Sequence, residues 1–303
     1  MRPASSSVRR ARPLLGTFVE ITVTGGSAAA MHTAVDEAFD AVATVHRLMS
    51  FHDAASDVSR LNRRAVTAAI RVHPWTYEVL QAAGDLHRRS HGVFDVTIAP
   101  TLQALGLLPG EHDDLPSPAP SGAGAAIELL SDFHVRFAHP GVRIDLGGIA
   151  KGFAVDRAVE VLRRAAMESG LVNAGGDLRG FGADGHRVHL RDPGDPRRLV
   201  GVLTLTDGAL ATTGGRFDPF AGAGAGRSPV IDPRRPWAAP AVLGVTVRAP
   251  SCTLADALTK VVMLEGERAL RVLDRYDADA LFWSPAGALT ITSDWAEALQ
   301  PAA

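Results

Sequence analysis

The chain has 303 residues and a formal net charge of −2, with 31 Lys and Arg against 33 Asp and Glu. A chain of this length can bury a substantial core, as one large domain or as two lobes that share a cleft. Because the charges nearly balance, neither the basic surface of a nucleic-acid-binding protein nor a polybasic membrane-binding segment is expected. We therefore expect a small-molecule or protein substrate, with no nucleic-acid partner and no membrane insertion.

Cysteine usage and the N-terminal region bear on the compartment. Cys252 is the only cysteine, which excludes an internal disulfide framework and a cysteine-based zinc site. Residues 1–13 are rich in Arg and are predicted to form a flexible segment, followed by a single domain over residues 14–300. The run over residues 14–23 contains threonine and glutamate, so it lacks the apolar core of a secretory signal. These features predict a cytoplasmic protein.

The first half of the chain is predicted to combine strands and helices. Residues 17–23 alternate polar and apolar side chains, which is typical of a half-buried strand. A long helix is predicted over residues 27–49, because apolar residues recur at helical spacing behind Ser27, a good N-cap. The other predicted elements are a helix over 57–62, a strand over 68–72 and a helix over 74–89 that begins with proline. Residues 109–125 are rich in Pro, Gly and Ser and are predicted to be a surface excursion.

The second half repeats this irregular alternation. Strands are predicted over 135–137, 142–146, 171–174, 243–247, 280–283 and 289–292, with several more between 174 and 213. Helices are predicted over 151–166, 253–264 and 267–276. Strands at hairpin-like spacings between single helices favour an α+β fold with mixed or antiparallel sheets over a doubly wound fold.

The segment RIDLGGIAKGFAVDR, residues 143–157, has the features of an anion site. A predicted strand ends at Asp145, two glycines follow, and a helix begins near Lys151. Free backbone N–H groups at a helix start, glycines that allow close approach and one lysine are what a phosphate requires. Asp145 would repel bare phosphate but could bind a sugar, ring or amide, which favours a nucleotide. An ordinary strand-to-helix turn with a solvated Lys151 is the alternative.

The segment TLADALTKVV, residues 253–262, has the features of a cation site. On a helix, Asp256, Thr259 and Lys260 share one face, so a carboxylate and a hydroxyl could reach a hard cation such as Mg²⁺ together. The alternative is a capping box formed by Thr253 and Asp256 with a solvated ion pair between Asp256 and Lys260. The residues alone favour this second interpretation.

Three further segments carry weaker signals. Phe51 and His52 follow a predicted helix, where an aromatic side chain could stack on a planar ring. Phe94 and Asp95 precede an apolar segment, and paired glycines at 175–176 allow close approach of the backbone to a ligand. A core Phe, a surface His and plain turns explain these features equally well.

Taken in order, these five segments resemble the FAD:protein FMN transferase (ApbE) family, from LLGTFVEI at Leu14 to the DALT helix. The resemblance implies an ApbE-like, T-fold-like fold of two lobes with flanking helices, and a flavin site between the lobes with Mg²⁺ at the pyrophosphate. The positions that it implies for FAD contact are Leu15, His52, Val93, Phe94, Asp95, Asp145, Lys151 and Ile231. The implied metal ligands are the Gly148 carbonyl and the side chains of Asp256 and Thr259, and the implied catalytic residues are Asp256 and Lys151.

The chain departs from the family pattern at several positions. Pro229 stands where the family has a histidine before the IDP segment, and Arg235 and Pro236 replace a Thr-Gly pair. Arg216 stands at a tyrosine position of the TSGxY motif. His52 stands at an expected aromatic position, and Lys260 replaces a threonine after DALx.

The resemblance implies Mg²⁺-dependent transfer of FMN from FAD to a threonine of an acceptor protein, with release of AMP. Two alternatives share the same site. One is hydrolysis of FAD to FMN and AMP, with water as the acceptor. The other is a non-catalytic flavin-binding protein, which the departures at Pro229 and Lys260 motivate.

Overall fold

The computed structural model describes residues 6–110, 123–183, 185–193, 197–214, 230–235, 239–292, 295 and 299–301. Three sheets form in this part of the chain, and every strand pairing in them is antiparallel. Together with the helices between the strands, this confirms the predicted α+β class.

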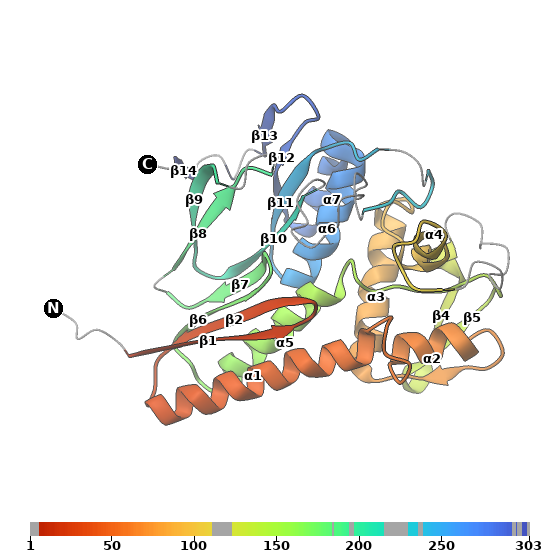
Figure 1. Cartoon of the computed structure of the whole chain (residues 1–303), viewed down its shortest axis with the longest axis horizontal. Helices are drawn as coiled ribbons and strands as arrows, with labels where there is room; N and C mark the ends of the chain where they lie inside the picture. The colour runs from red at the N-terminus through yellow and green to blue at the C-terminus, as the bar shows by residue number, and fades with distance from the viewer. Residues whose placement is uncertain are drawn as a thin grey trace.

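The largest sheet has eight strands in the order β1-β2-β6-β7-β10-β11-β12-β13 (Figure 1). Its strands are β1 (Ser7–Leu14), β2 (Thr17–Thr24), β6 (Ser169–Ala174), β7 (Asp177–Phe181), β10 (Gly208–Gly214), β11 (Gly244–Ala249), β12 (Asp279–Trp283) and β13 (Leu289–Ile291). A second sheet orders β14 (Leu299–Pro301), β9 (Leu199–Leu205) and β8 (His186–Arg191). The third orders β3 (Ile70–Arg71), β5 (His134–Phe137) and β4 (Ile127–Leu130).

The large sheet is covered on both faces. Helices α1 (Ala28–Met49), α5 (Ala150–Arg164) and α6 (Cys252–Glu265) pack on one face, and their apolar stripes share one core with the strands. The second sheet covers part of the other face. Neighbouring residues of β10 show the division, because Ala209 and Ala211 belong to the helix-side core whereas Leu210 packs with Leu203 and Trp295. This is the period of two that strands impose on their side chains.

A smaller lobe lies beside this sheet, on the right of Figure 1. It contains α2 (Asp57–Arg64), α3 (Pro74–Arg89), α4 (Ala99–Ala104) and the β3-β5-β4 sheet, with α7 (Leu270–Leu273) back in the larger lobe beside α6. The helix α3 has the predicted bounds and begins with proline behind the cap residue His73. A 3₁₀ turn, η1 (Val96–Ile98), leads into α4.

The predicted helices over 27–49, 151–166 and 253–264 are confirmed as α1, α5 and α6, and Ser27 caps α1 by accepting a hydrogen bond from Ala30. The prediction of one helix over 267–276 was wrong, because a single turn of α-helix lies there between two 3₁₀ turns. Most of the predicted excursion at 109–125 lies outside the described residues.

The flexible segment predicted over residues 1–13 needs correction from Ser7 onward. Residues Ser7–Leu14 form β1 at the edge of the large sheet and pair with β2 along their whole length. Most side chains of β1 are partly or fully exposed, and Arg10 and Arg12 form ion pairs with Asp36 of α1. Charged side chains are common on edge strands. Because the arginines of β1 resemble those of a solvated tail, the composition of this segment did not indicate a strand.

The strand predicted over residues 142–146 was also wrong. The backbone of Ile144 pairs with the side chain of Asn62 instead of a neighbouring strand: Ile144 N donates to Asn62 Oδ1 at 2.7 Å, and Asn62 Nδ2 donates to Ile144 O at 2.9 Å. The next backbone N–H, that of Asp145, donates to the carbonyl of Val96 at 2.8 Å. These bonds satisfy the backbone of an extended segment without a sheet, and they fix Asp145 beside η1.

Candidate functional site

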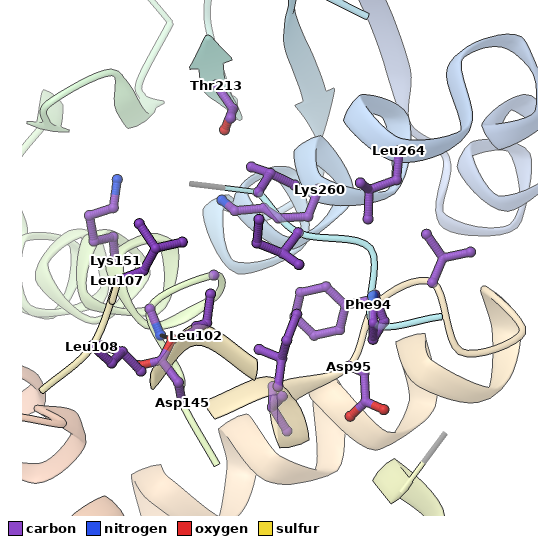
Figure 2. Close-up of a pocket in the computed structure, with 18 of the residues that line it drawn as sticks. Phe94, Asp95, Leu102, Leu107, Leu108, Asp145, Lys151, Thr213, Lys260 and Leu264 are labelled. Atoms are coloured by element: carbon purple, nitrogen blue, oxygen red, sulfur yellow. Dashed lines mark hydrogen bonds between the residues drawn. The ribbon is translucent and has the colours of Figure 1, made fainter. Parts of the chain in front are cut away.

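A cavity of about 570 Å³ lies between the two lobes. In Figure 2, Thr213, Lys260 and Leu264 lie along the top of the view, whereas Asp145, Phe94 and Asp95 lie below them. The remaining walls are mainly apolar and come from α4 and the residues after it, from residues 93–98 and from residues 230–233. A volume of this size, with apolar walls and a few charged groups, is typical of a small-molecule site.

The crossing of α5 and α6 builds the charged wall of this cavity. Gly152 lies in the first turn of α5, and a Cβ there would lie 2.1 Å from the carbonyl oxygen of Cys252. Because this residue has no side chain, the two helices approach closely enough for Gly152 N to donate to Asp256 Oδ2 at 3.0 Å. In the other direction, Asp156 of α5 accepts hydrogen bonds from Cys252 N at 2.9 Å and Thr253 N at 2.8 Å at the start of α6. Each helix therefore supplies a carboxylate to free N–H groups in the first turn of the other.

Two lysines and two carboxylates form a charged cluster at this crossing. Lys151 Nζ lies 2.8 Å from Asp177 Oδ2, and Lys260 Nζ forms an ion pair with Asp256 Oδ1 one turn earlier on α6. Asp256 is fully buried and Asp177 is 1% exposed. The cluster is electrically balanced, with two cations against two anions.

Burial and mutual repulsion separate the protonation behaviour of the two acids. Loss of solvent, followed by the charge of Asp256, raises the pKa of Asp177 to about 6 despite the neighbouring lysines. Burial would also raise the pKa of Asp256, but Lys260 and Lys151 outweigh it and lower that pKa. Burial would lower the pKa of Lys151, but Asp177 and Asp256 raise it. Asp256 therefore stays ionised at neutral pH, and Asp177 is the carboxylate that gains a proton as the pH falls toward its pKa of about 6.

The hydroxyl of Thr259 is engaged within the protein. Its Oγ1 lies 2.8 Å from Oγ1 of Thr213 on β10 and donates to the carbonyl of Asp256 at 2.7 Å. Thr259 is fully buried and does not line the cavity, whereas Thr213 does. The predicted capping box of Thr253 and Asp256 was wrong, because Ser251 caps α6 and Thr253 bonds to Asp156.

The loop over residues 145–149 forms the floor below the lysines. Asp145 lines the cavity and accepts a hydrogen bond from Gly147 N at 3.1 Å. Loss of solvent raises the pKa of Asp145, and the Gly147 hydrogen bond and the charge of His52 offset this only in part. Gly148 faces Lys260, since a Cβ there would lie 3.6 Å from Lys260 Cε.

Residues 93–95 line the cavity from the smaller lobe. Phe94 is 4% exposed, and its ring can offer a flat apolar surface. The Asp95 carboxylate is engaged elsewhere, because its Oδ1 accepts from Thr97 N at 2.8 Å and from Thr97 Oγ1 at 2.6 Å. Figure 2 shows this carboxylate turned away from Lys260. Asp95 therefore shapes the wall by capping η1.

The structure brings together most of the predicted flavin positions. Val93, Phe94, Asp95, Asp145, Lys151 and Ile231 all line the cavity, as does Gly148. Leu15 and His52 are not among its lining residues. Leu15 lies at the turn between β1 and β2 with a φ of 57° and donates its N–H to His46 Nδ1 at 3.2 Å.

Two residues of the site were missed by sequence reasoning. Asp177 belongs to the charged cluster through its ion pair with Lys151, and Thr213 lines the cavity and bonds to Thr259 of α6. Asp177 directly follows the glycine pair at 175–176, both with positive φ, so the glycines were the signal for it. Among the departures from the family pattern, Arg235 pairs with Asp232 at 3.1 Å. Pro229, Pro236 and Arg216 lie outside the described residues.

Two of the three predicted metal ligands, the side chains of Asp256 and Thr259, do not fit a divalent cation as they are arranged, whereas the third, Gly148, lines the cavity. Both carboxylate oxygens of Asp256 are bonded, one to Lys260 and one to Gly152, and the Thr259 hydroxyl is bonded to Thr213. Within the ranges that the structure describes, no three His, Cys, Asp or Glu residues are grouped to hold a metal ion. Mg²⁺ requires near-octahedral oxygen ligation, and the ammonium of Lys260 lies beside the one carboxylate that could anchor it.

Comparisons with known proteins point to one family. The model of the ApbE family matches residues 15–282. An FAD:protein FMN transferase from Rhodobacter capsulatus is 31% identical over 218 residues, which cover 67% of this chain and 41% of that protein. An FAD:protein FMN transferase from Vibrio cholerae is 30% identical over 236 residues, which cover 74% of this chain and 70% of that protein. This chain therefore spans less than half the length of the first relative.

Solved structures agree with this. The ApbE protein of Thermotoga maritima has a TM-score of 0.83 at 26% identity, with 97% of this chain and 99% of that chain covered. The flavin transferase ApbE from Vibrio cholerae has a TM-score of 0.80 at 26% identity, with 97% and 100% covered. In the part of the chain that the structure describes, no helix has both the length and the apolar composition needed to span a bilayer.

Proposed function

Because this chain belongs to the ApbE family, we propose that it transfers FMN from FAD to a threonine hydroxyl of an acceptor protein and releases AMP. One observation carries the proposal. The cavity between the lobes combines the apolar wall at Phe94 with the ammonium groups of Lys151 and Lys260. A flavin nucleotide needs the same combination, with a flat apolar surface for its ring and cations for its phosphates.

Different residues contact different parts of FAD. Phe94 and Ile231 pack on the flavin ring, and Asp145 accepts a hydrogen bond from the ring or the ribityl chain. Lys151 and Lys260 face the pyrophosphate from α5 and α6. Leu15 and His52 lie outside the cavity lining and stay predicted FAD contacts.

The transfer exchanges one phosphorus–oxygen bond for another. The threonine oxygen attacks the FMN phosphorus, the bond from that phosphorus to the bridging oxygen breaks, and AMP leaves with this oxygen. The hydroxyl proton passes to solvent. Lys151 and Lys260 stabilise the charge that develops on the transferring phosphoryl group and on AMP, since catalysis of such transfers depends on positioning and charge stabilisation.

Asp256 supports this step through its neighbours. Its carboxylate holds Lys260 and the first turn of α5, which carries Lys151. Asp256 is therefore a positioning residue for both ammonium groups. No step of the proposed transfer passes through Mg²⁺, because the two side chains that the resemblance assigns to it, Asp256 and Thr259, are engaged with Lys260, Gly152 and Thr213.

The test is to incubate the purified protein with FAD, with and without a flavin-acceptor domain that presents a threonine. AMP is measured by chromatography, and FMN attached to the acceptor is measured by intact mass. Acceptor-dependent AMP with an equal amount of attached FMN is the expected result. AMP without attachment would establish hydrolysis instead, and FAD binding with neither product, in MgCl₂ as well as in EDTA, would establish a binding protein.

A further inference from the structure

We propose that the ammonium of Lys260 is the resident cation beside Asp256, so that this site holds the pyrophosphate of FAD without a divalent metal ion. The pyrophosphate part of this inference rests on the proposed function. The metal-binding part rests on the geometry at Asp256 alone.

The first argument is the position of the ammonium. Lys260 Nζ donates to the backbone carbonyl of Asp256 at 3.0 Å and pairs with the carboxylate oxygen Oδ1 of the same residue. It therefore takes two of the oxygen atoms that a cation on this face of α6 would use. The third, the hydroxyl of Thr259, is bonded to Thr213 and to the same carbonyl.

The second argument is the surroundings of the pair. The side chain of Asp256 is 0% exposed and that of Lys260 is 19% exposed, while Lys260 also lines the cavity. A solvated surface pair exchanges readily with ions, but a buried carboxylate that loses its partner is left with an uncompensated charge. The ammonium of Lys260 is thus held at the Asp256 carboxylate. Because Lys260 lines the cavity, this ammonium can also contact a ligand there.

The third argument is charge balance. The two carboxylates, Asp177 and Asp256, are matched by Lys151 and Lys260. If Lys260 stayed, a divalent cation at Asp256 would leave this cluster with two excess positive charges. The cation would lie next to the Lys260 ammonium, and neighbouring like charges repel strongly in a buried site. It could enter only by displacing the ammonium. A pyrophosphate in the cavity would contact the two ammonium groups directly.

The experiment separates metal binding from flavin binding. Mn²⁺ serves as the metal probe, and its free concentration is followed by electron paramagnetic resonance during titration with the full chain. FAD affinity is measured by flavin fluorescence in MgCl₂ and in EDTA. The variants are Lys260→Thr, which removes the ammonium and adds a hydroxyl, and Thr259→Val, which removes the nearby hydroxyl but keeps the ammonium.

We expect no stoichiometric Mn²⁺ binding to the unmodified protein or to the Thr259→Val variant, and the same FAD affinity in MgCl₂ and in EDTA. Lys260→Thr should bind Mn²⁺ and bind FAD about tenfold more tightly in MgCl₂ than in EDTA. Stoichiometric Mn²⁺ binding by the unmodified protein that Asp256→Asn abolishes would overturn the inference. So would a tenfold gain in FAD affinity on adding MgCl₂ to the unmodified protein.

The two proposals can fail separately. If the protein binds no FAD in either solution, the proposed function fails, and the Mn²⁺ titration still decides the occupancy of Asp256. If Lys260→Thr does not fold, the two measurements on the unmodified protein decide the inference without it.

Discussion

Asp256 on α6 accepts a hydrogen bond from the backbone N–H of Gly152 on α5 at 3.0 Å. The same carboxylate holds Lys260, and Gly152 follows Lys151 directly in the chain. One fully buried side chain therefore sets the positions of both ammonium groups. The geometry of the charged wall depends on how closely the two helices cross.

Replacement of Gly152 by alanine should disrupt this crossing. The added Cβ would lie 2.1 Å from Cys252 O and 2.8 Å from Asp256 Cβ, and the backbone of α6 cannot move aside cheaply. We expect Gly152→Ala to lower the free energy of unfolding by about 3 kcal/mol, at the upper end of overpacking effects. Urea denaturation followed by circular dichroism measures this loss.

Gly84 offers a matched control within another helix. A Cβ at Gly84 of α3 would meet only the end of the Arg88 side chain, at 3.6 Å. Gly84→Ala should therefore stabilise the protein by about 0.5–1 kcal/mol, as alanine does in an open helix position. An equal loss of stability in both variants would show that the close approach of α5 and α6 does not explain the effect.

Removal of the Lys151 ammonium should weaken ligands that carry phosphate. Because Lys151→Met alone would leave Asp177 buried without its partner, the double variant Lys151→Met with Asp177→Asn keeps the cluster balanced. We expect its affinity for FAD to fall about tenfold, and its affinity for riboflavin, which has no phosphate, to stay the same. Fluorescence titration with each flavin measures both, and an equal loss for the two ligands would place Lys151 away from the phosphates.

The affinity for FAD should depend on pH through Asp177. Its pKa is raised to about 6 by burial and by Asp256, so the group gains a proton as the pH falls through this value. The cluster then carries one net positive charge, and anion binding is favoured. We expect FAD to bind several-fold more tightly at about pH 5.5 than at about pH 7.5, measured by equilibrium titration.

Two variants identify the group that titrates. Asp177→Asn should remove this pH dependence, because the amide cannot take up the proton. Asp145 also has a raised pKa and lines the cavity, so Asp145→Asn is the matched comparison. This variant should keep the pH dependence of FAD affinity that comes from Asp177. A pH dependence that persists unchanged in Asp177→Asn would assign it to another group.

The long helices could be predicted from sequence, because each one carries its own signals. The helix α1 has Ser27 as its cap and a regular apolar face, and α3 begins with proline. The edge strand β1 could not be predicted in the same way, because it is formed by pairing with β2 and its arginines resemble a solvated tail. Local periodicity reports burial along one element and carries no information about the strand or helix with which that element pairs.

The same limit applies to the site. Asp145, Lys151 and Lys260 lie in segments with local motifs, and the structure brings them into one cavity. The ion pair of Lys260 with Asp256 was anticipated from its helical spacing, but its burial was not, because burial depends on how α5 crosses α6. Asp177 was missed for this reason too, since its partner Lys151 lies on another element.

Asn62 provides a test of the loop that carries Asp145 without touching the cavity itself. Its side chain satisfies both the N–H and the C=O of Ile144, and no sheet partner replaces it among the described residues. Asn62→Ala leaves these two groups unpaired at a cost of roughly 1–3 kcal/mol each, and the segment that ends at Asp145 loses its anchor. We expect a lower free energy of unfolding together with weaker FAD binding.

Asn62→Asp is the comparison, because it keeps the acceptor for Ile144 N and loses the donor to Ile144 O. Its free energy of unfolding and its FAD affinity should fall between those of the parent protein and of Asn62→Ala. Full FAD affinity in Asn62→Ala would show that Asp145 is held in place by η1 alone, through its hydrogen bond to Val96.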